Sequence, residues 1–176
     1  MNHPRRREVE RFIHVDSRDF NGSEISSYNI CFGPLPKDND GKLIDVPAGS
    51  AYLPVQDYNN VIKLELKAFM SNKPPSEDYV IFKIKNVDGK VDTTTGIGDA
   101  CTVCYFDPNG KKPIYFGGTE FEFNPPISKL SNLKIDIVDH ENNYCDIREP
   151  GNGNDGNKIG SQSFLLKITY IEGNLY

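Results

Sequence analysis

The chain has 176 residues and a mass of 19.8 kDa, which is the length of one ordinary domain and enough to bury a core without a disulfide or metal. Its net charge of −5 at pH 7 argues against a dedicated nucleic-acid-binding protein, because that function needs a basic face. No apolar run is long enough to span a membrane, and none follows the Arg-rich start to form a secretory signal.

The first element in chain order is a basic segment. It contains Arg5, Arg6 and Arg7. We expect residues 1–11 to form an N-terminal arm and residues 12–176 to form a single domain. Glu8 and Glu10 dilute the positive charge of this arm. Two interpretations therefore stay open: a solvated terminus, or a tether that lies across an acidic neighbour such as another copy or another protein.

A short strand is expected next, at Phe12–Val15, and it runs into the charged segment Asp16-Ser17-Arg18-Asp19. Arg18 can hold the chain at the strand end by a bidentate pair with a carboxylate, and Ser17 can accept a hydrogen bond from a turn amide. An ordinary exposed turn is the alternative. We hypothesise that the segment orders the arm against the domain or a neighbouring subunit. The candidate interaction residues are Arg5, Arg6, Arg7, Asp16, Arg18 and Asp19.

The rest of the chain alternates apolar and polar residues with a period of two, which is the pattern of strands with one wet face. In the longest run, this alternation places five apolar residues on one face: Ile62, Leu64, Leu66, Ala68 and Met70. The strands predicted after Val15 are 27–32, 61–70, 80–85, 101–106, 114–116, 120–123, 133–137, 144–147 and 164–170.

Turn-forming residues such as Asp40-Gly41 and Pro125-Pro126 separate these strands. Two connections are long: Gly33–Asn60, with four prolines, and the Gly- and Asn-rich Glu149–Ser161. Because long structureless loops are uncommon in compact domains, we expect the first to be functional or to dock on a neighbour. Short strands without crossover helices predict an all-β antiparallel two-sheet sandwich. A single jelly roll fits best, and an immunoglobulin-like sandwich is the alternative.

One pair of cysteines has the spacing of a zinc site. Cys101 and Cys104 are three residues apart, and Cys145 with His140 would complete four ligands. Residues three apart on a strand point to opposite faces, however, so free thiols are expected instead. The segment Asp38-Asn-Asp-Gly41 hints at calcium, but an EF-hand register lacks two required carboxylates. We therefore expect no metal and no other cofactor.

The sequence contains no pattern typical of catalysis. It has no Gly-x-Ser-x-Gly motif and no phosphate-binding loop, and its three histidines, at positions 3, 14 and 140, are not closely spaced. Asp16 and Asp19 are paired carboxylates, but Arg18 lies between them and neutralises their charge. We therefore expect that this protein is not an enzyme.

Six short motifs occur in order along the chain. They are Ile13-His-Val-Asp16-Ser-Arg-Asp19, Ser27-Tyr-Asn-Ile30, Tyr58-Asn-Asn-Val61-Ile-Lys-Leu-Glu-Leu66, Phe123-Asn-Pro125, Leu130-Ser-Asn-Leu133-Lys-Ile135 and Phe164-Leu-Leu166-Lys-Ile168. This ordered set resembles the single-jelly-roll minor capsid and penton-type proteins of the large icosahedral DNA viruses of the nucleocytoplasmic group. Two features depart from that family: Phe20 stands where another arginine often follows, and the linker Gly33–Tyr58 is longer.

The resemblance implies a structural virion protein, a minor capsid or penton subunit that is made in the host cytoplasm and assembled into the capsid shell. Its implied partners are the capsomers of the major capsid protein and other minor capsid proteins, with no specific nucleic acid. Two arrangements stay open: a homopentamer that closes a vertex, or single copies that cement the gaps between capsomers.

A carbohydrate- or receptor-binding β-sandwich module is the main alternative. Such modules expose aromatic side chains on one face, and the candidates here are Tyr105, Tyr115 and Phe116. Packing of these rings in the core or between sheets is the competing interpretation. A zinc-dependent interaction domain is a third hypothesis, which metal analysis of the purified protein would decide.

Overall fold

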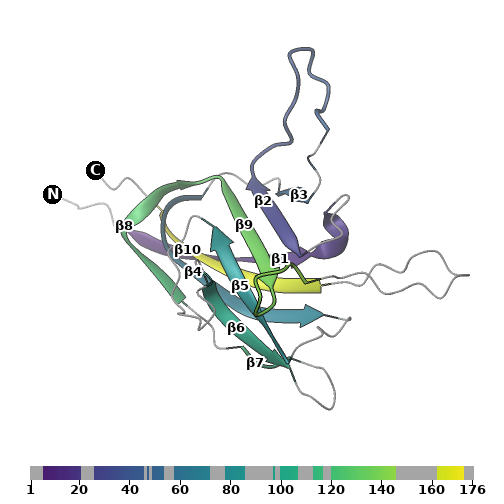
Figure 1. The fold of residues 1–176 in the computed structure, drawn as a ribbon. Helices are drawn as coiled ribbons and strands as arrows, with labels where there is room; N and C mark the ends of the chain where they lie inside the picture. The colour runs from purple at the N-terminus through teal and green to yellow at the C-terminus, as the bar shows by residue number, and fades with distance from the viewer. Residues whose placement is uncertain are drawn as a thin grey trace, which may run out of the picture.

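A computed structural model describes residues 6–20, 26–45, 47, 49–53, 58–71, 78–85, 97, 100–106, 113–116, 120–145 and 162–172. These residues form ten β-strands and one turn of 3₁₀ helix, and the strands make two sheets that pack as a sandwich (Figure 1). No α-helix occurs in this described part of the chain. The predicted all-β two-sheet sandwich is confirmed.

The first sheet has four strands and the second has six. In spatial order, the first consists of β1 (Arg7–Asp16), β10 (Gln162–Glu172), β4 (Tyr58–Ser71) and β8 (Glu120–Leu130). The second consists of β3 (Ser50–Leu53), β2 (Ser27–Phe32), β9 (Asn132–Val138), β5 (Tyr79–Lys85), β6 (Ala100–Phe106) and β7 (Pro113–Phe116). The 3₁₀ turn η1 (Ser17–Asp19) follows β1. Neighbouring strands are antiparallel, except for β2 and β3, which are parallel.

The chain passes repeatedly from one sheet to the other. When the edge strands β3 and β7 are set aside, β1, β4, β8 and β10 belong to the first sheet and β2, β5, β6 and β9 to the second. Among these eight strands, only β5 and β6 follow one another along the chain and also pair in the same sheet. This wiring is compatible with a single jelly roll.

The core fills the space between the two sheets and is rich in aromatic rings. Tyr28, Phe82, Phe121 and Phe164 are fully buried. The ring of Phe69 on β4 meets that of Phe82 on β5 edge to face, with centroids 4.9 Å apart. Burying each such side chain stabilises the fold by about 1.5–3 kcal/mol relative to exposure. Contacts of this kind hold the first sheet on the second.

The first strand is longer than the prediction. It begins at Arg7 rather than Phe12 and pairs with β10 over its whole length, from Arg7 opposite Glu172 to Asp16 opposite Ser163. Residues 7–11, which we expected in the N-terminal arm, therefore belong to the edge strand of the first sheet.

Two β-bulges make the predicted face of the longest strand partly wrong. The pairing of β4 with β10 slips twice, so that Ile62 and Lys67 are extra residues on β4. A slip of one residue exchanges the inward and outward positions. Ala68 and Met70 are consequently exposed, Met70 by 67%. The buried residues of β4 are Tyr58, Val61, Leu64, Leu66 and Phe69.

Three other segments differ from the prediction. The strand β8 continues through Pro125-Pro126, where we expected a turn, because an edge strand tolerates residues that cannot donate to a ladder. The long connection Gly33–Asn60 contains β3, which was not predicted. Of the predicted strand 144–147, Tyr144 forms one bridge with Val138, and residues 146–147 lie outside the described residues. The predicted loop Glu149–Ser161 lies outside the described residues.

Candidate interaction site

The charged segment after β1 folds into the 3₁₀ turn, and Asp16 caps it. The backbone N of Arg18 donates a 2.9 Å hydrogen bond to Oδ1 of Asp16. The side chain of Arg18 donates from Nε to the same oxygen, also at 2.9 Å, and from Nη2 to Oδ2. The bidentate pair therefore forms between Arg18 and Asp16. Both of its bonds are local, because the two residues are two apart in sequence.

The pair leaves one partner open to solvent and buries the other. The Asp16 side chain is 11% exposed and that of Arg18 is 72% exposed. The side-chain hydrogen bond from Arg18 lowers the pKa of Asp16 to about 2, and the same contact raises the pKa of Arg18. Asp16 thus holds Arg18 in place while most of the Arg18 side chain faces the surroundings.

Buried hydrogen bonds connect this turn to both sheets. The backbone N of Gln162, the first residue of β10, donates to Oγ of Ser17 at 2.9 Å. Oε1 of Gln162 accepts hydrogen bonds from Tyr28 Oη at 2.6 Å and from Ser26 Oγ at 2.8 Å. All four residues are buried. Ser17 was expected to accept from a turn amide, and it accepts instead from a strand. The turn is therefore fixed where the two sheets meet.

A hairpin projects from the sandwich close to this turn (Figure 1). It comprises residues 33–45, between β2 and β3, and we call it the 33–45 hairpin. Lys37 and Leu43 form an antiparallel bridge across it. At its tip, Oδ1 of Asp38 accepts hydrogen bonds from the backbone N of Asp40 at 3.0 Å and of Lys42 at 2.8 Å. The polar turn predicted here is confirmed.

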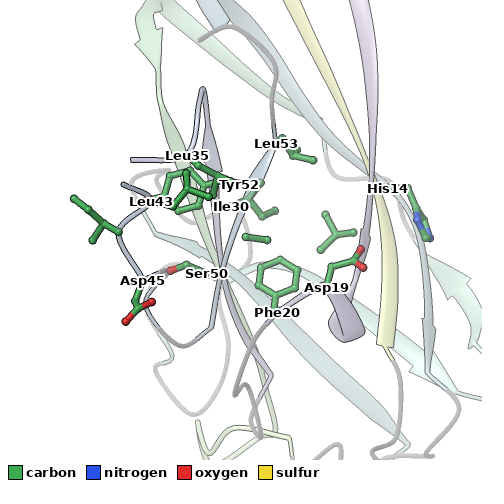
Figure 2. Close-up of a pocket in the computed structure, with 13 residues that line it drawn as sticks. His14, Asp19, Phe20, Ile30, Leu35, Leu43, Asp45, Ser50, Tyr52 and Leu53 are labelled. Atoms are coloured by element: carbon green, nitrogen blue, oxygen red, sulfur yellow. The ribbon is translucent and has the colours of Figure 1, made fainter. Parts of the chain in front are cut away.

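A groove of about 520 Å³ lies between the 33–45 hairpin and the end of β1 (Figure 2). Figure 2 shows Leu35 and Leu43 on one side of it and Phe20 on the other. Two carboxylates, those of Asp19 and Asp45, also line it. Its main apolar residues are Val15, Phe20, Ile30, Leu35, Leu43 and Ile44.

Three aliphatic side chains of the groove are open to solvent. Leu35 is 42% exposed, Leu43 55% and Ile44 48%. Exposed apolar residues that gather in one place are typical of contact surfaces. The length of the connection Gly33–Asn60 predicted a functional or docking segment but not these residues. The available signal was large aliphatic residues in a stretch without strand periodicity.

The predicted interaction residues do not gather at one site. Arg5 lies outside the described residues, and Arg6 and Arg7 are exposed at the start of β1. Asp16 lies at the other end of this strand, about 30 Å away for nine steps of extended chain. Only the segment Asp16–Asp19 is therefore next to the groove, where Asp19 contributes to the lining.

Both cysteines of the predicted zinc spacing face the core, so the prediction of opposite faces is wrong. The pairing of β5 with β6 slips by one residue and leaves Cys101 as an extra residue on β6. Cys101 and Cys104 are consequently buried in the same cluster. The backbone N of Ile84 donates to Cys101 Sγ at 3.2 Å. Among the described residues, no three His, Cys, Asp or Glu side chains gather where they could hold a metal ion.

One aromatic residue of the alternative sugar-binding surface is exposed. Tyr105 is 51% exposed, and its ring centroid lies 6.0 Å from that of Tyr79. The backbones of Tyr115 and Phe116 belong to β7, but their side chains lie outside the described part of the structure.

Comparisons with known proteins leave the family open. No protein-family model matches the chain, and a search of characterised proteins finds no match either. Within the residues that the structure describes, no helix has the length and apolar character needed to cross a membrane.

Proposed function

We propose that this protein is a structural virion protein, a minor capsid or penton subunit of a large icosahedral DNA virus, and that it acts through protein–protein contacts in the capsid shell. The observation that carries this proposal is the groove beside the 33–45 hairpin. One wall of the groove is the end of β1, which buried hydrogen bonds tie to both sheets. A surface that is ordered before it binds loses little conformational entropy on docking.

The exposed aliphatic residues supply the driving force for such a contact. Fully burying a Leu or Ile side chain contributes about 1.5–3 kcal/mol relative to exposure, and Leu43 and Ile44 are each about half exposed. Each would therefore contribute about 1 kcal/mol when a neighbouring protein covers it. Apolar contacts are not directional and discriminate little between partners. The carboxylates of Asp19 and Asp45 would therefore select the partner by charge.

The motifs that resemble the viral family support the same proposal. The motif around Asp16–Asp19 ends in the turn beside the groove. Those at Tyr58–Leu66 and Phe164–Ile168 lie on β4 and β10, the two central strands of the first sheet. The resemblance therefore includes the two central strands of the first sheet and the turn on one side of the groove, whereas the 33–45 hairpin on the other side belongs to the linker that is longer than in that family.

Quantitative mass spectrometry of purified virions tests this function. A structural subunit is expected at a fixed copy number: about 60 per particle if five copies close each vertex, and several hundred if single copies cement capsomers. Absence from the virion, or a copy number that drifts between preparations, would refute the proposal.

A matched pair of variants tests the groove itself. Leu43→Ser combined with Ile44→Ser is expected to lower incorporation into particles without lowering the thermal stability of the isolated protein. Met70→Ser is the control, because Met70 is an apolar residue with 67% exposure on a different strand, β4. Equal incorporation of both variants would show that exposed apolar residues at the groove have no special role.

A carbohydrate-binding function is the second candidate, and the exposed ring of Tyr105 next to Tyr79 favours it. Aromatic rings that are open on one face suit stacking on a sugar. Binding of the purified monomer to a glycan array, with loss of binding in Tyr105→Ala, would support this candidate over the capsid function.

A further inference from the structure

The groove and the basic N-terminal segment lie at opposite ends of β1. His14 lines the groove and Arg7 is the first residue of the strand, so about 23 Å of extended chain separates them. Arg5 is two residues before Arg7, and its backbone reaches at most about 7 Å from Arg7 even if the chain turns back. The N-terminal arginines of one chain therefore cannot enter the groove of the same chain.

The chemistry of the groove nevertheless matches that segment. Asp19 and Asp45 are both exposed, and no Lys or Arg is among the described residues that line the groove. An arginine suits this combination, because its aliphatic stem packs on Leu or Ile side chains while its guanidinium group pairs with a carboxylate. The residues that precede Arg5 include Met1 and Pro4, which can contact the apolar lining.

We propose that the groove receives residues 1–6 of a second copy of this chain, with Arg5 and Arg6 against the carboxylates of Asp19 and Asp45. The contact is heterologous, because the segment and the groove are different surfaces of the same chain. Repetition of one heterologous contact closes a ring if the rotation between copies allows it. This inference rests on the proposed function, in which a ring of copies at a vertex is one arrangement.

A charge exchange between two full-length chains tests the contact. The first chain carries Arg5→Glu and Arg6→Glu, and the second carries Asp19→Lys and Asp45→Lys. Sedimentation velocity over a range of protein concentrations measures the self-association of wild type, of each variant alone and of their equimolar mixture. The control carries Asp40→Lys and Glu141→Lys, which make the same charge change at exposed positions outside the groove lining.

The wild type and the control are expected to associate as concentration rises. Each exchanged chain alone is expected to self-associate at least about 10-fold more weakly than the wild type. The mixture should recover association, because each segment then meets a groove of opposite charge. Three results would overturn the inference: a wild type that stays monomeric at every concentration, exchanged chains that associate like wild type, or a mixture no better than its components.

Incorporation into virions separates this inference from the proposed function. If the exchanged chains fail to restore one another while the wild type remains at fixed copy number in particles, the segment-to-groove contact is refuted and the structural role stands. If the wild type is absent from particles, the proposed function falls, whatever the sedimentation result.

Discussion

The hydroxyl of Tyr28 donates a 2.6 Å hydrogen bond to Oε1 of Gln162, and this buried bond joins the second sheet to the first. The two residues are 134 positions apart in sequence. Through its backbone N, Gln162 also holds Ser17, so the position of the charged turn beside the groove depends on a contact between the two sheets.

Removing either partner of this bond is expected to destabilise the fold. Tyr28→Phe should lower the free energy of unfolding by about 1 kcal/mol, and Gln162→Leu by about 1–3 kcal/mol because it leaves the buried Tyr28 hydroxyl without its acceptor. Urea denaturation measures both, and Tyr105→Phe at an exposed ring is the control. The double variant should lose less than the sum of the two single losses, because they remove the same bond. Additive losses would show that the two residues do not act together.

The Asp16–Arg18 pair predicts a particular dependence of stability on pH. The pKa of Asp16 is about 2 in the folded protein against an ordinary value of 3.8. A carboxyl whose pKa is lowered by folding stabilises the fold above its unfolded pKa, and this contribution disappears as pH falls through the folded value. The free energy of unfolding should therefore decline between about pH 4 and pH 2. Asp16→Asn and Arg18→Ala should each flatten this decline, and an unchanged slope in both variants would contradict the assignment.

The exposed side chain of Arg18 predicts a role outside the isolated fold. Arg18→Ala should lower incorporation into particles while the purified protein stays folded; its melting temperature at neutral pH should fall modestly, because Asp16 loses the partner that lowers its pKa. Lys42→Ala is the control, since Lys42 is an exposed cation of the 33–45 hairpin. Equal incorporation of Arg18→Ala and wild type would remove Arg18 from the contact surface.

Substitution of two glycines distinguishes the effect of backbone strain on stability from the effect of a steric contact. Gly49 and Gly41 have φ of 74° and 79°, which side-chain-bearing residues adopt at a cost of about 1–3 kcal/mol. A Cβ on Gly49 would also lie 3.3 Å from the carbonyl oxygen of Ser27, whereas one on Gly41 would meet nothing within 4 Å. Gly49→Ala should therefore lower the melting temperature more than Gly41→Ala. Hydrogen exchange should show faster exchange in β3, and equal effects of both variants would contradict this difference.

The four free thiols should react in two groups. Cys31 and Cys145 are half-buried, whereas Cys101 and Cys104 are buried. Burial also raises the pKa of the Cys104 thiol to about 12, so almost no thiolate is present there at neutral pH. Titration with a coloured disulfide reagent should modify Cys31 and Cys145 first and the other two only after denaturant is added. Rapid reaction of all four thiols in the native protein would contradict the buried positions.

Local sequence patterns were sufficient to predict the fold class and the charged turn. Alternation with a period of two is a property of one strand, so the strands and the two-sheet sandwich could be predicted without knowing which strand pairs with which. The bond between Arg18 and Asp16 could be predicted for the same reason, since it connects residues two positions apart.

Only the tertiary structure decided the features that depend on a partner strand. A bulge is an extra residue relative to the neighbouring strand, so it cannot be predicted from the sequence of one strand. For this reason the sequences of β4 and β6 did not predict that Met70 faces outward or that both Cys101 and Cys104 face inward. The partner of Ser17 is 145 residues away, and the groove brings together the end of β1, the 33–45 hairpin and β3. The amino-acid sequence by itself therefore determined most of the strand segments, while pairing between strands determined which side chains form the core and which remain open to a partner.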